Sequence, residues 1–302
     1  GRDDSETPRR LETETGRIRF AAPVEAAELP GDPDLLVVDE AAALPVRLLE
    51  RFLAADAVAY ATTIHGYEGA GRGFSIRFRD RLAEADRPVT DVRLDEPIRY
   101  AAGDPVEVWS FRALALDAGP APDEAVDDVD LDEAAYEALD SSRLLADEAL
   151  LREAFGLLVL AHYRTEPNDL ARLLDAPNVS VRVLRADGHV VSVALLAREG
   201  GLDEARRGSM FEGERVRGNM LPDVLTSQLR DEDAGRPVGQ RVMRIATHPA
   251  LRGRGLGSRL LGDVREEFSG EVDWLGVGYG ATPDLVDFWR GNDYRTVHLS
   301  TT

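Results

Sequence analysis

The sequence has 302 residues, of which 43% are hydrophobic, and its 56 acidic against 36 basic side chains give a net charge of −20. Cysteine is absent, which excludes a disulfide framework and a thiolate metal site. No apolar run reaches the roughly 18 residues of a membrane-spanning helix, and no signal segment stands at the N-terminus. We therefore expect a soluble, cytoplasmic protein that contacts no membrane and is long enough for two domains.

The charge has a second feature: every basic residue is arginine, and lysine does not occur. A strongly acidic surface of this kind indicates a salt-loving organism, in which ions screen the self-repulsion. A GC-rich genome that favours codons for Arg, Ala and Asp explains the same composition, and both explanations can hold. Net acidity argues against a nucleic-acid partner, but phosphate attraction is weak in molar salt. Charge therefore does not decide the partner.

The first third of the chain predicts alternating strands and helices. Residues 1–17 are polar and lack periodicity, which is typical of a disordered segment or of the cut end of a longer chain. A short strand at 18–22, a strand buried on both faces at 35–38, a helix at 47–53 and a second buried strand at 58–63 follow. This alternation indicates an α/β layer.

The strand at 35–38 ends in two carboxylates. Its sequence LLVVDE has the form of a Walker B strand, in which Asp39 would hold Mg²⁺ and Glu40 would orient a water for hydrolysis. An acidic strand end that leads into a helix is an equally good reading of the motif alone. A P-loop requires lysine, so this chain contains none, and we expect no ATP hydrolysis from it alone.

An acidic segment separates the two halves of the sequence. Between residues 117 and 140 there are ten acidic residues and no basic ones, with two prolines near the start. This composition predicts a solvated linker at 117–142. The domains on either side are then 18–116 and 143–302.

The second half predicts a longer series of elements. Asp187 and Gly188 form a two-residue hairpin turn between two of the strands. The expected elements are a helix at 147–162, strands at 179–184, 190–197 and 240–247, a helix at 257–268, a strand at 274–279, a helix at 283–290 and a strand at 296–299.

The most informative stretch is the turn RGRGLG at 252–257, between a predicted strand and helix. It fits the pattern Q/R-x-x-G-x-G/A. Gly255 and Gly257 allow the backbone to approach a ligand closely, and the helix behind them begins with free N–H groups and a positive dipole end. The turn therefore predicts a pyrophosphate site, although a glycine-rich strand–turn–helix alone also occurs in ordinary tight turns and in dinucleotide-binding sites.

This turn resembles the acetyl-CoA site of the GNAT N-acetyltransferases. Together with motifs spread along most of the chain, it resembles the tRNA-Met cytidine acetyltransferase family, in which a helicase-like ATPase module is fused to a GNAT domain. The motifs occur in the family's order: DEAAALP (39–45), ATTIHGYEGAGRGF (61–74), EPIRY (96–100), AHYRTEPNDL (161–170), RVRGN (215–219), RIATHP (244–249) and WLGVGYGAT (274–282).

The resemblance implies a fold and a function. The fold is the rear part of a RecA-like module that lacks its P-loop, followed by a GNAT α+β domain, in a chain truncated at both ends. The function is formation of N(4)-acetylcytidine in elongator tRNA-Met from acetyl-CoA, with ATP and Mg²⁺ used by the full-length family. The oligomeric state and the range of RNAs are not predicted.

The resemblance also assigns roles to individual residues. In the ATPase-like module, Thr62 and Thr63 are the strand-end sensor and Arg99 contacts the nucleotide. In the GNAT domain, three backbone amides face the cofactor and a seven-residue cradle holds its pyrophosphate. The amides are those of Ile245, Ala246 and Thr247, and the cradle is Arg252, Gly253, Arg254, Gly255, Leu256, Gly257 and Ser258.

The catalytic base is left open between two residues. His248 directly follows the cofactor strand and has a suitable ordinary pKa, but a structural histidine that shapes the His-Pro turn is the alternative. Asp284 stands where the family carries an acidic residue, and its alternative role is charge at a helix N-terminus. Trp289 stands where many GNAT enzymes place a tyrosine that protonates the thiolate, so that role has no occupant. Gly291 replaces an arginine that the family tends to carry.

RNA contacts are predicted in one cluster of arginines: Arg206, Arg207, Arg215 and Arg217, with Tyr163 and Arg164 as further candidates. A flexible surface loop is the alternative interpretation of that cluster. Two other functions stay open: a stand-alone GNAT enzyme that acts on a protein or small-molecule amine, and an inactive remnant that binds acetyl-CoA. A general helicase is disfavoured, because no second RecA core follows.

Overall fold

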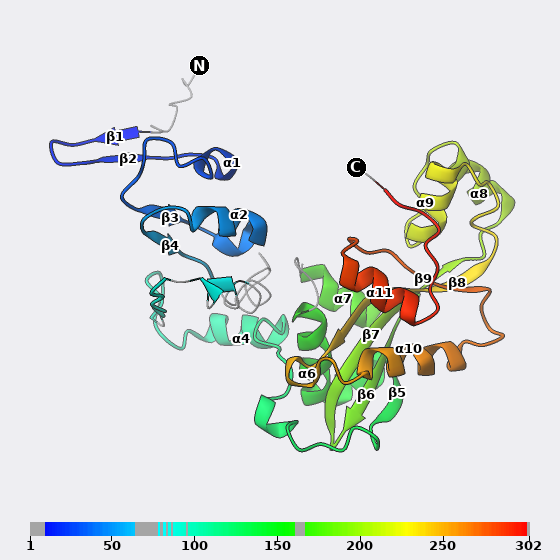
Figure 1. The fold of residues 1–302 in the computed structure, drawn as a ribbon. Coiled ribbons are helices and arrows are strands. Elements are labelled where there is room, and N and C mark those ends of the chain that lie inside the picture. Colours follow the sequence, from blue (N-terminus) through cyan, green and yellow to red (C-terminus); the bar gives the residue numbers. More distant parts are fainter. Residues whose placement is uncertain are drawn as a thin grey trace. The chain divides into compact units, whose positions relative to one another are not determined.

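The computed structural model describes residues 10–63, 78, 81, 82, 84, 85, 87–94, 96–160 and 167–300. The chain divides into two units, residues 1–95 and 96–302, and each is described by itself (Figure 1). Within the described ranges, no helix is long and apolar enough to cross a membrane. Nor do three or more His, Asp or Glu side chains of these ranges gather as metal ligands.

The first unit is built on two parallel strands joined through a helix. Leu49, Phe52 and Phe78 are buried in the core of this unit, and the Tyr60 hydroxyl donates to the Leu49 carbonyl at 2.8 Å. The alternation of strand and helix confirms the predicted α/β layer. In chain order the elements are β1 (Arg10–Glu12), β2 (Arg17–Arg19), α1 (Pro23–Ala26), β3 (Leu36–Val38), η1 (Ala41–Ala43), α2 (Val46–Phe52) and β4 (Val58–Tyr60).

The burial predicted for β3 is wrong. Val38 is buried, but Val37 points to the other face and is 63% exposed. Successive side chains of a strand alternate between the two faces, and the described core of this unit covers only one of them. The strand expected at 18–22 is also different: it is the short β2, which pairs with β1 as an exposed hairpin.

The second unit is a five-stranded sheet with helices on both faces. The strand order is β5-β6-β7-β8-β9, antiparallel except for the parallel pair β8 and β9. The strands are β5 (Ala135–Leu139), β6 (Val179–Ala186), β7 (His189–Gly200), β8 (Val238–Thr247) and β9 (Trp274–Val277). The helices are α4 (Pro105–Ala113), η2 (Asp123–Ala125), α5 (Ser141–Ala146), α6 (Glu148–Leu160), α7 (Pro167–Asp175), α8 (Glu204–Phe211), α9 (Met220–Leu229), η3 (Pro249–Leu251), α10 (Leu256–Glu267) and α11 (Pro283–Gly291).

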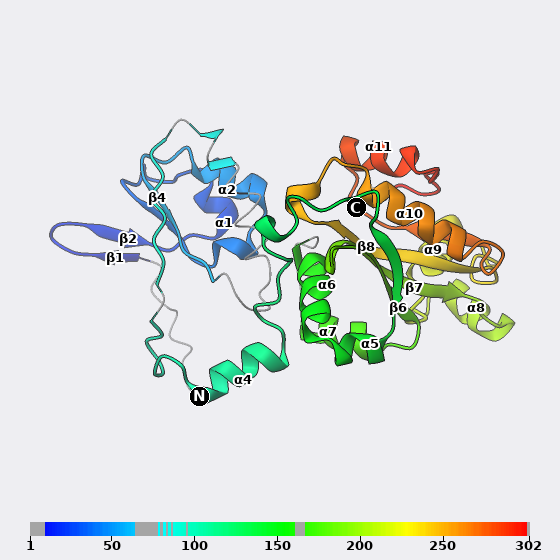
Figure 2. The same ribbon diagram turned by 90° about the horizontal axis from the view of Figure 1, so that it is seen from below.

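Two cores fix the helices on the sheet. Val193 and Leu195 of β7 join the core that contains α6 and α7, whereas Ala194 and Leu196 join the core that contains α10 and α11. Because alternate residues of a strand point to opposite faces, the two pairs of helices cover opposite faces of the sheet (Figure 2). Most of the predicted elements of this half are confirmed within a few residues.

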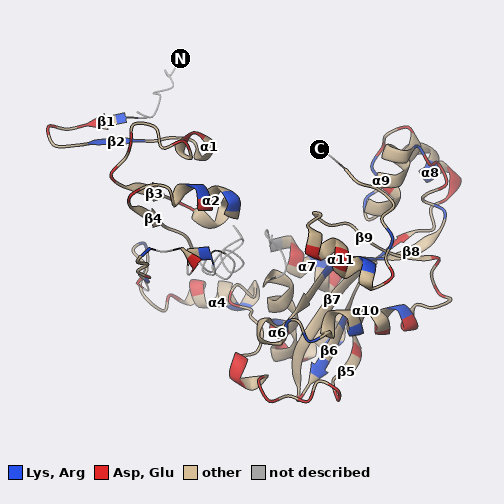
Figure 3. Cartoon of the chain, viewed as in Figure 1, with Lys and Arg blue, Asp and Glu red and all other residues tan. Residues whose placement is uncertain are grey.

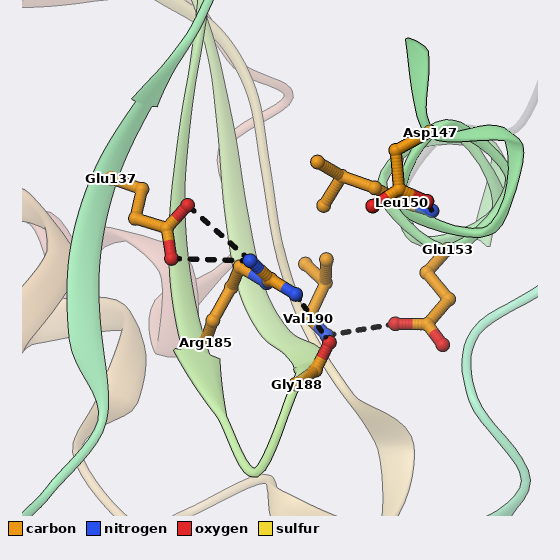
Figure 4. A network of polar contacts seen from close by, with 7 residues as sticks. All are labelled: Glu137, Asp147, Leu150, Glu153, Arg185, Gly188 and Val190. Atoms are coloured by element: carbon orange, nitrogen blue, oxygen red, sulfur yellow. Dashed lines mark hydrogen bonds and ion pairs between the residues drawn. The ribbon is translucent and has the colours of Figure 1, made fainter. Parts of the chain in front are cut away.

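The hairpin between β6 and β7 has the turn that its sequence predicts. Asp187 and Gly188 have φ of 48° and 87°, as a two-residue type I′ turn requires. Figure 4 shows how the hairpin is held: Arg185 donates to Glu137 at 3.2 Å and to the Gly188 carbonyl at 2.7 Å. From α6, the Glu153 carboxylate accepts the Val190 N–H at 2.9 Å.

The linker predicted at 117–142 is wrong for most of its length. Ala121, Val126 and Ala134 are buried in the core beneath α10, and residues 135–139 form β5, the edge strand paired with β6. The acidic side chains point outward while small apolar residues between them pack inward, so the charge count concealed the core positions. Figure 3 shows the resulting acidic stretch ahead of β5.

The strand predicted at 296–299 does not form. This segment has no strand partner among the described residues, and Val297 and Leu299 are 69% and 67% exposed. An alternating pattern makes a strand only when a neighbouring edge supplies hydrogen bonds.

Candidate functional site

The site is built where two neighbouring strands of the sheet part. β8 and β9 are paired only from Gly239 to Val242, opposite Trp274 to Val277. β8 then continues to Thr247, paired with β7 alone, and the irregularity between Leu195 and Leu196 of β7 places the extra residue Met243 where β9 departs. β8 therefore has an open edge over its last residues, next to the end of β9.

The pairing register decides which backbone groups face this open edge. The His248 N–H donates to the Val191 carbonyl of β7 at 3.0 Å. Because backbone groups alternate in direction along a strand, Ala246 also faces β7, and the N–H groups of Ile245 and Thr247 face the open edge. Two of the three predicted amides are thus available to a ligand, and the third is committed to the sheet.

The glycine turn lies at the end of β8 and has the geometry of an anion site. Gly253 and Gly255 have φ of 75° and 82°, the left-handed region that favours glycine, and a Cβ at either position would meet open space. No described residue accepts a hydrogen bond from the N–H groups of Gly253, Arg254 or Gly255. These donors and the positive end of α10 lie together, which is the arrangement that binds phosphates.

The helix behind the turn, α10, is fixed at its first residues by the core and lies against α11. Leu256 is buried in the core, and the Arg259 N–H donates to the Gly255 carbonyl at 2.9 Å, which starts the helical ladder. A Cβ at Gly257 would lie 3.5 Å from the Phe288 ring of α11, an ordinary contact. Alanine is therefore sterically acceptable at Gly257, as the motif allows, but strained at Gly255.

Positive charge is concentrated at the same turn. Arg252, Arg254 and Ser258 are exposed, and neither arginine forms an ion pair within the described part of the chain. In a chain with a net charge of −20, two unpaired guanidinium groups beside free amides favour an anion locally. The residues from Arg252 to Ser258 fit a pyrophosphate, and the open edge of β8 fits the amide-bearing arm of a coenzyme A thioester.

His248 lies beside this site but is inaccessible. Its side chain is fully buried, and its Nε2 lies 2.8 Å from the Ala121 carbonyl oxygen. Its Nδ1 has no hydrogen-bond partner in the described part of the chain and lies 3.9 Å from the nearest carboxylate oxygen, that of Asp123. This position supports the structural role, in which His248 ties the segment before β5 to the end of β8.

The other predicted catalytic residue is accessible. Asp284 is exposed in the first turn of α11, where the Thr282 hydroxyl caps the helix by accepting the Leu285 N–H at 3.4 Å. Trp289 of the same helix is only 4% exposed. Its ring packs edge-on against Phe288 and Tyr294, and the Tyr279 ring centroid lies 5.9 Å away.

Three features near the site, two ion pairs and one aromatic side chain, were not predicted from the sequence. Arg244 of β8 pairs with Asp169 of α7 at 2.8 Å. Arg241 pairs at 2.5 Å with Glu199, whose carboxylate is fully buried and also accepts the Leu221 N–H of α9 at 2.9 Å. Partners from distant elements leave no local sequence signal. Tyr279, the third, is visible inside the WLGVGYGAT motif, but nothing in the sequence places it beside α11.

Only two of the four predicted RNA-binding arginines are unpaired. Arg206 lies 3.9 Å from Asp203, and Arg207 donates to the Leu202 carbonyl at 2.9 Å. Arg215 and Arg217 are exposed in the loop before α9 and form no ion pair within the described ranges. Tyr163 and Arg164 lie outside the described residues.

In the first unit, Asp39 and Glu40 follow β3 and are exposed, as the Walker B interpretation expects. The neighbouring strand end supplies Thr62, whose hydroxyl accepts the Ala42 N–H at 3.3 Å. Arg99 is exposed and belongs to the second unit. A Mg²⁺ or ATP role for Asp39, Glu40 and Arg99 stays a prediction.

Comparison with known families gives two matches that follow one another along the chain. A model described as "RNA cytidine acetyltransferase NAT10/TcmA, helicase domain" matches residues 2–117. A second, described as "GNAT acetyltransferase 2", matches residues 153–273 and 259–302.

Among curated proteins, the tRNA(Met) cytidine acetyltransferase TmcA of Haloferax volcanii is 69% identical over 287 residues, which is 95% of this chain and 38% of that protein. The protein of the same name from Haloarcula marismortui is 65% identical over all 302 residues, 39% of its length. The chain thus spans about two fifths of the length of these relatives.

Among solved structures, the ribosomal-protein-alanine N-acetyltransferase of Brucella melitensis is 15% identical, with a TM-score of 0.35 over 56% of this chain and 97% of its own. The aminoglycoside N-acetyltransferase AAC(6')-Iy in complex with CoA is 13% identical, with a TM-score of 0.34 over 56% of this chain and 93% of its own. Likeness at this level says nothing about a substrate.

Proposed function

Since this chain belongs to the family of the tRNA(Met) cytidine acetyltransferases, we propose that it transfers the acetyl group of acetyl-CoA to the exocyclic amine of a cytidine in tRNA. The observation that carries this proposal is the turn from Arg252 to Ser258, with its left-handed glycines and free N–H groups, at the end of the open edge of β8. A tRNA substrate places the proposed reaction in the cytoplasm.

Acetyl-CoA, when bound, supplies an acetyl group activated as a thioester. In the proposed complex the N–H groups of Gly253, Arg254 and Gly255, the Arg252 and Arg254 guanidinium groups and the α10 dipole offset the pyrophosphate charge. The N–H groups of Ile245 and Thr247, on the open edge of β8, donate hydrogen bonds to the thioester arm. One of them stabilises the negative charge that develops on the acetyl oxygen during the transfer.

The acceptor amine of cytosine is neutral but a poor nucleophile, because its lone pair is delocalised into the ring. Holding it in line with the thioester contributes more than prior deprotonation. In the proposed reaction the amine nitrogen bonds to the acetyl carbon and coenzyme A leaves as its thiolate. The amine proton needs an acceptor only as the N–C bond forms. We propose Asp284 for this task, because it is exposed on α11, whose Phe288 lies against the glycine turn, whereas His248 is buried.

Transfer of radiolabelled acetyl groups to an elongator tRNA-Met transcript, followed by nucleoside analysis, tests the proposal. The chain is expected to label cytidine as N(4)-acetylcytidine in molar KCl, and Gly255→Glu is expected to label nothing. Parallel reactions with and without ATP separate transfer by this chain from any ATP requirement. Label on protein or small-molecule amines, with none on cytidine, would favour a stand-alone GNAT enzyme instead, and binding without any transfer would identify an inactive remnant.

A further inference from the structure

A partly exposed aromatic and apolar surface lies at the carboxyl end of β9, beside the open edge of β8. Tyr279 lies two residues after the end of β9 and is 38% exposed, and its ring is tilted by 30° to that of Trp289, with the ring centroids 5.9 Å apart. Met220 at the start of α9 is 37% exposed, and its Cε lies against Gly278. The proposed transfer uses neither side chain.

Close contacts hold the start of α9 against the end of β9. A Cβ on Gly276 would lie 2.5 Å from Leu221 Cδ1, and a Cβ on Gly278 would lie 2.6 Å from Met220 Cε, so only glycine lets α9 approach β9 this closely. The buried Glu199 carboxylate accepts the Leu221 N–H at 2.9 Å. The start of α9 is therefore a fixed wall at the end of β9.

The loop that leads into α9 adds positive charge to this wall. Arg215 and Arg217 are exposed and have no carboxylate partner among the residues that the structure describes. Asn219, two residues on, anchors the loop by accepting the Gly200 N–H at 2.8 Å. Exposed arginines without a carboxylate partner bind phosphate, and an exposed aromatic ring stacks on an unstacked base, so the two features together suit a single-stranded nucleotide.

We propose that Arg215, Arg217, Met220 and Tyr279, which we call the α9–β9 surface, hold the unpaired nucleotide that presents the acceptor cytosine. The base stacks on the Tyr279 ring against Met220, and Arg217 contacts the flanking phosphate. Stacking is less sensitive to salt than phosphate attraction, so it suits a chain whose net charge of −20 repels phosphate. The inference rests on the proposed function, because it takes the acceptor to be an RNA nucleotide.

Binding of the tRNA-Met transcript to the 302-residue chain, measured by fluorescence anisotropy over a KCl series, tests the surface independently of catalysis. Tyr279→Ala is expected to weaken RNA binding about tenfold, whereas Tyr279→Phe, which keeps the ring, binds like the unsubstituted chain. Arg217→Ala is expected to reduce the slope of log K against log [KCl] by about 0.7 to 1. Arg265→Ala, which removes the same charge from an exposed residue paired with Asp293 at 2.7 Å, is the matched control and keeps the slope.

Acetyl-CoA titration completes the test, and all four variants are expected to keep that affinity within twofold. RNA affinity that is unchanged in Tyr279→Ala, equally weak in Tyr279→Phe, or absent from the unsubstituted chain would overturn the surface. Loss of acetyl-CoA affinity in Tyr279→Ala would overturn it too. RNA binding that depends on Tyr279 without any acetyl transfer would instead refute the proposed function and leave the surface standing.

Discussion

At the scale of single residues, the site depends on backbone conformation more than on side chains. Gly255 combines a φ of 82° with open space where a side chain would stand, and its N–H has no partner among the described residues. Gly257, two residues on, is helical and touches Phe288. The same motif thus contains one glycine that its backbone conformation requires and one that alanine can replace.

Gly255→Glu is expected to abolish acetyl-CoA binding, because it puts a strained side chain and a negative charge into the proposed pyrophosphate cradle. Isothermal titration in molar KCl measures the effect. Gly262→Glu adds the same charge farther along α10, where a Cβ also meets open space, and is expected to retain the affinity. Equal affinity in the Gly255 variant and the unsubstituted chain would place the cofactor elsewhere.

His248→Ala is expected to lower the free energy of unfolding by about 2–3 kcal/mol, because it leaves a cavity and an unpaired Ala121 carbonyl. Chemical denaturation measures this loss, and acetyl-CoA affinity in the folded variant should persist. A variant of unchanged stability and unchanged acetyl-CoA affinity that no longer transfers the acetyl group would return His248 to the role of base.

Single residues also show which features of the structure can be predicted from the sequence and which cannot. The Asp187–Gly188 turn and the Arg252–Gly257 turn are local, because their conformations depend on glycine within a few positions, and both were predictable. The pairs of Arg244 with Asp169 and of Arg241 with Glu199 join residues from different elements. Such pairs follow from the topology, which short-range patterns do not encode.

At the scale of elements, α10 is held to the sheet by a partly buried ion pair as well as by its apolar face. Arg182 of β6, with a side chain only 9% exposed, donates to both carboxylate oxygens of Glu267 at 2.6 and 2.5 Å. Tyr136 of β5 also donates to this carboxylate. Strands β5 and β6 and helix α10 are thereby joined at the end of α10 opposite the glycine turn.

The Arg182 hydrogen bonds hold the pKa of Glu267 below its ordinary value of 4.5. A lowered pKa in the folded state contributes stability above the ordinary pKa, and this contribution is lost as the pH falls through the folded-state pKa. Glu267→Gln is expected to cost about 1–3 kcal/mol at pH 7, since Arg182 is left without its counter-ion, and to flatten the acid limb of stability against pH.

Urea denaturation between pH 3 and pH 7 provides the measurement. Glu266→Gln, on the same turn of α10 but exposed, is the matched control and should follow the unsubstituted chain. An acid limb that is equally steep in Glu267→Gln would show that other carboxylates govern it.

Two secondary-structure predictions were wrong, one because of the acidic composition of a segment and the other because of its alternating pattern. The segment before β5 was assigned to solvent on its acidic residues, yet Ala121, Val126 and Ala134 within it are buried. The expected strand at 296–299 had the right alternation but lacks a neighbouring edge. Both errors concern residues whose structure is decided by what packs against them rather than by their own preference.

At the scale of the whole molecule, the net charge of −20 dominates behaviour in solution. Self-repulsion among carboxylates opposes the folded state, and dissolved ions screen it. The described arginines that have no ion pair include those of the glycine turn and of the α9–β9 surface. Dissolved ions therefore stabilise the overall fold but weaken the attraction of the two proposed sites for anions.

Thermal unfolding is expected to shift upward by roughly 5–10 °C between 0.2 and 3 M KCl, equivalent to about 2–3 kcal/mol. The chain with Asp127→Asn, Asp128→Asn and Asp130→Asn, which removes three charges of the acidic stretch before β5, should show a smaller shift. A midpoint independent of KCl would contradict an account of stability based on charge screening.

The central claim is that the turn from Arg252 to Ser258 and the open edge of β8 bind acetyl-CoA. A crystal structure of the chain with acetyl-CoA tests this claim most directly. It should show pyrophosphate oxygens within hydrogen-bond distance of the Gly253, Arg254 and Gly255 N–H groups, and the thioester arm along Ile245 and Thr247. A cofactor bound away from the turn, or a turn whose N–H groups point elsewhere in the complex, would contradict it.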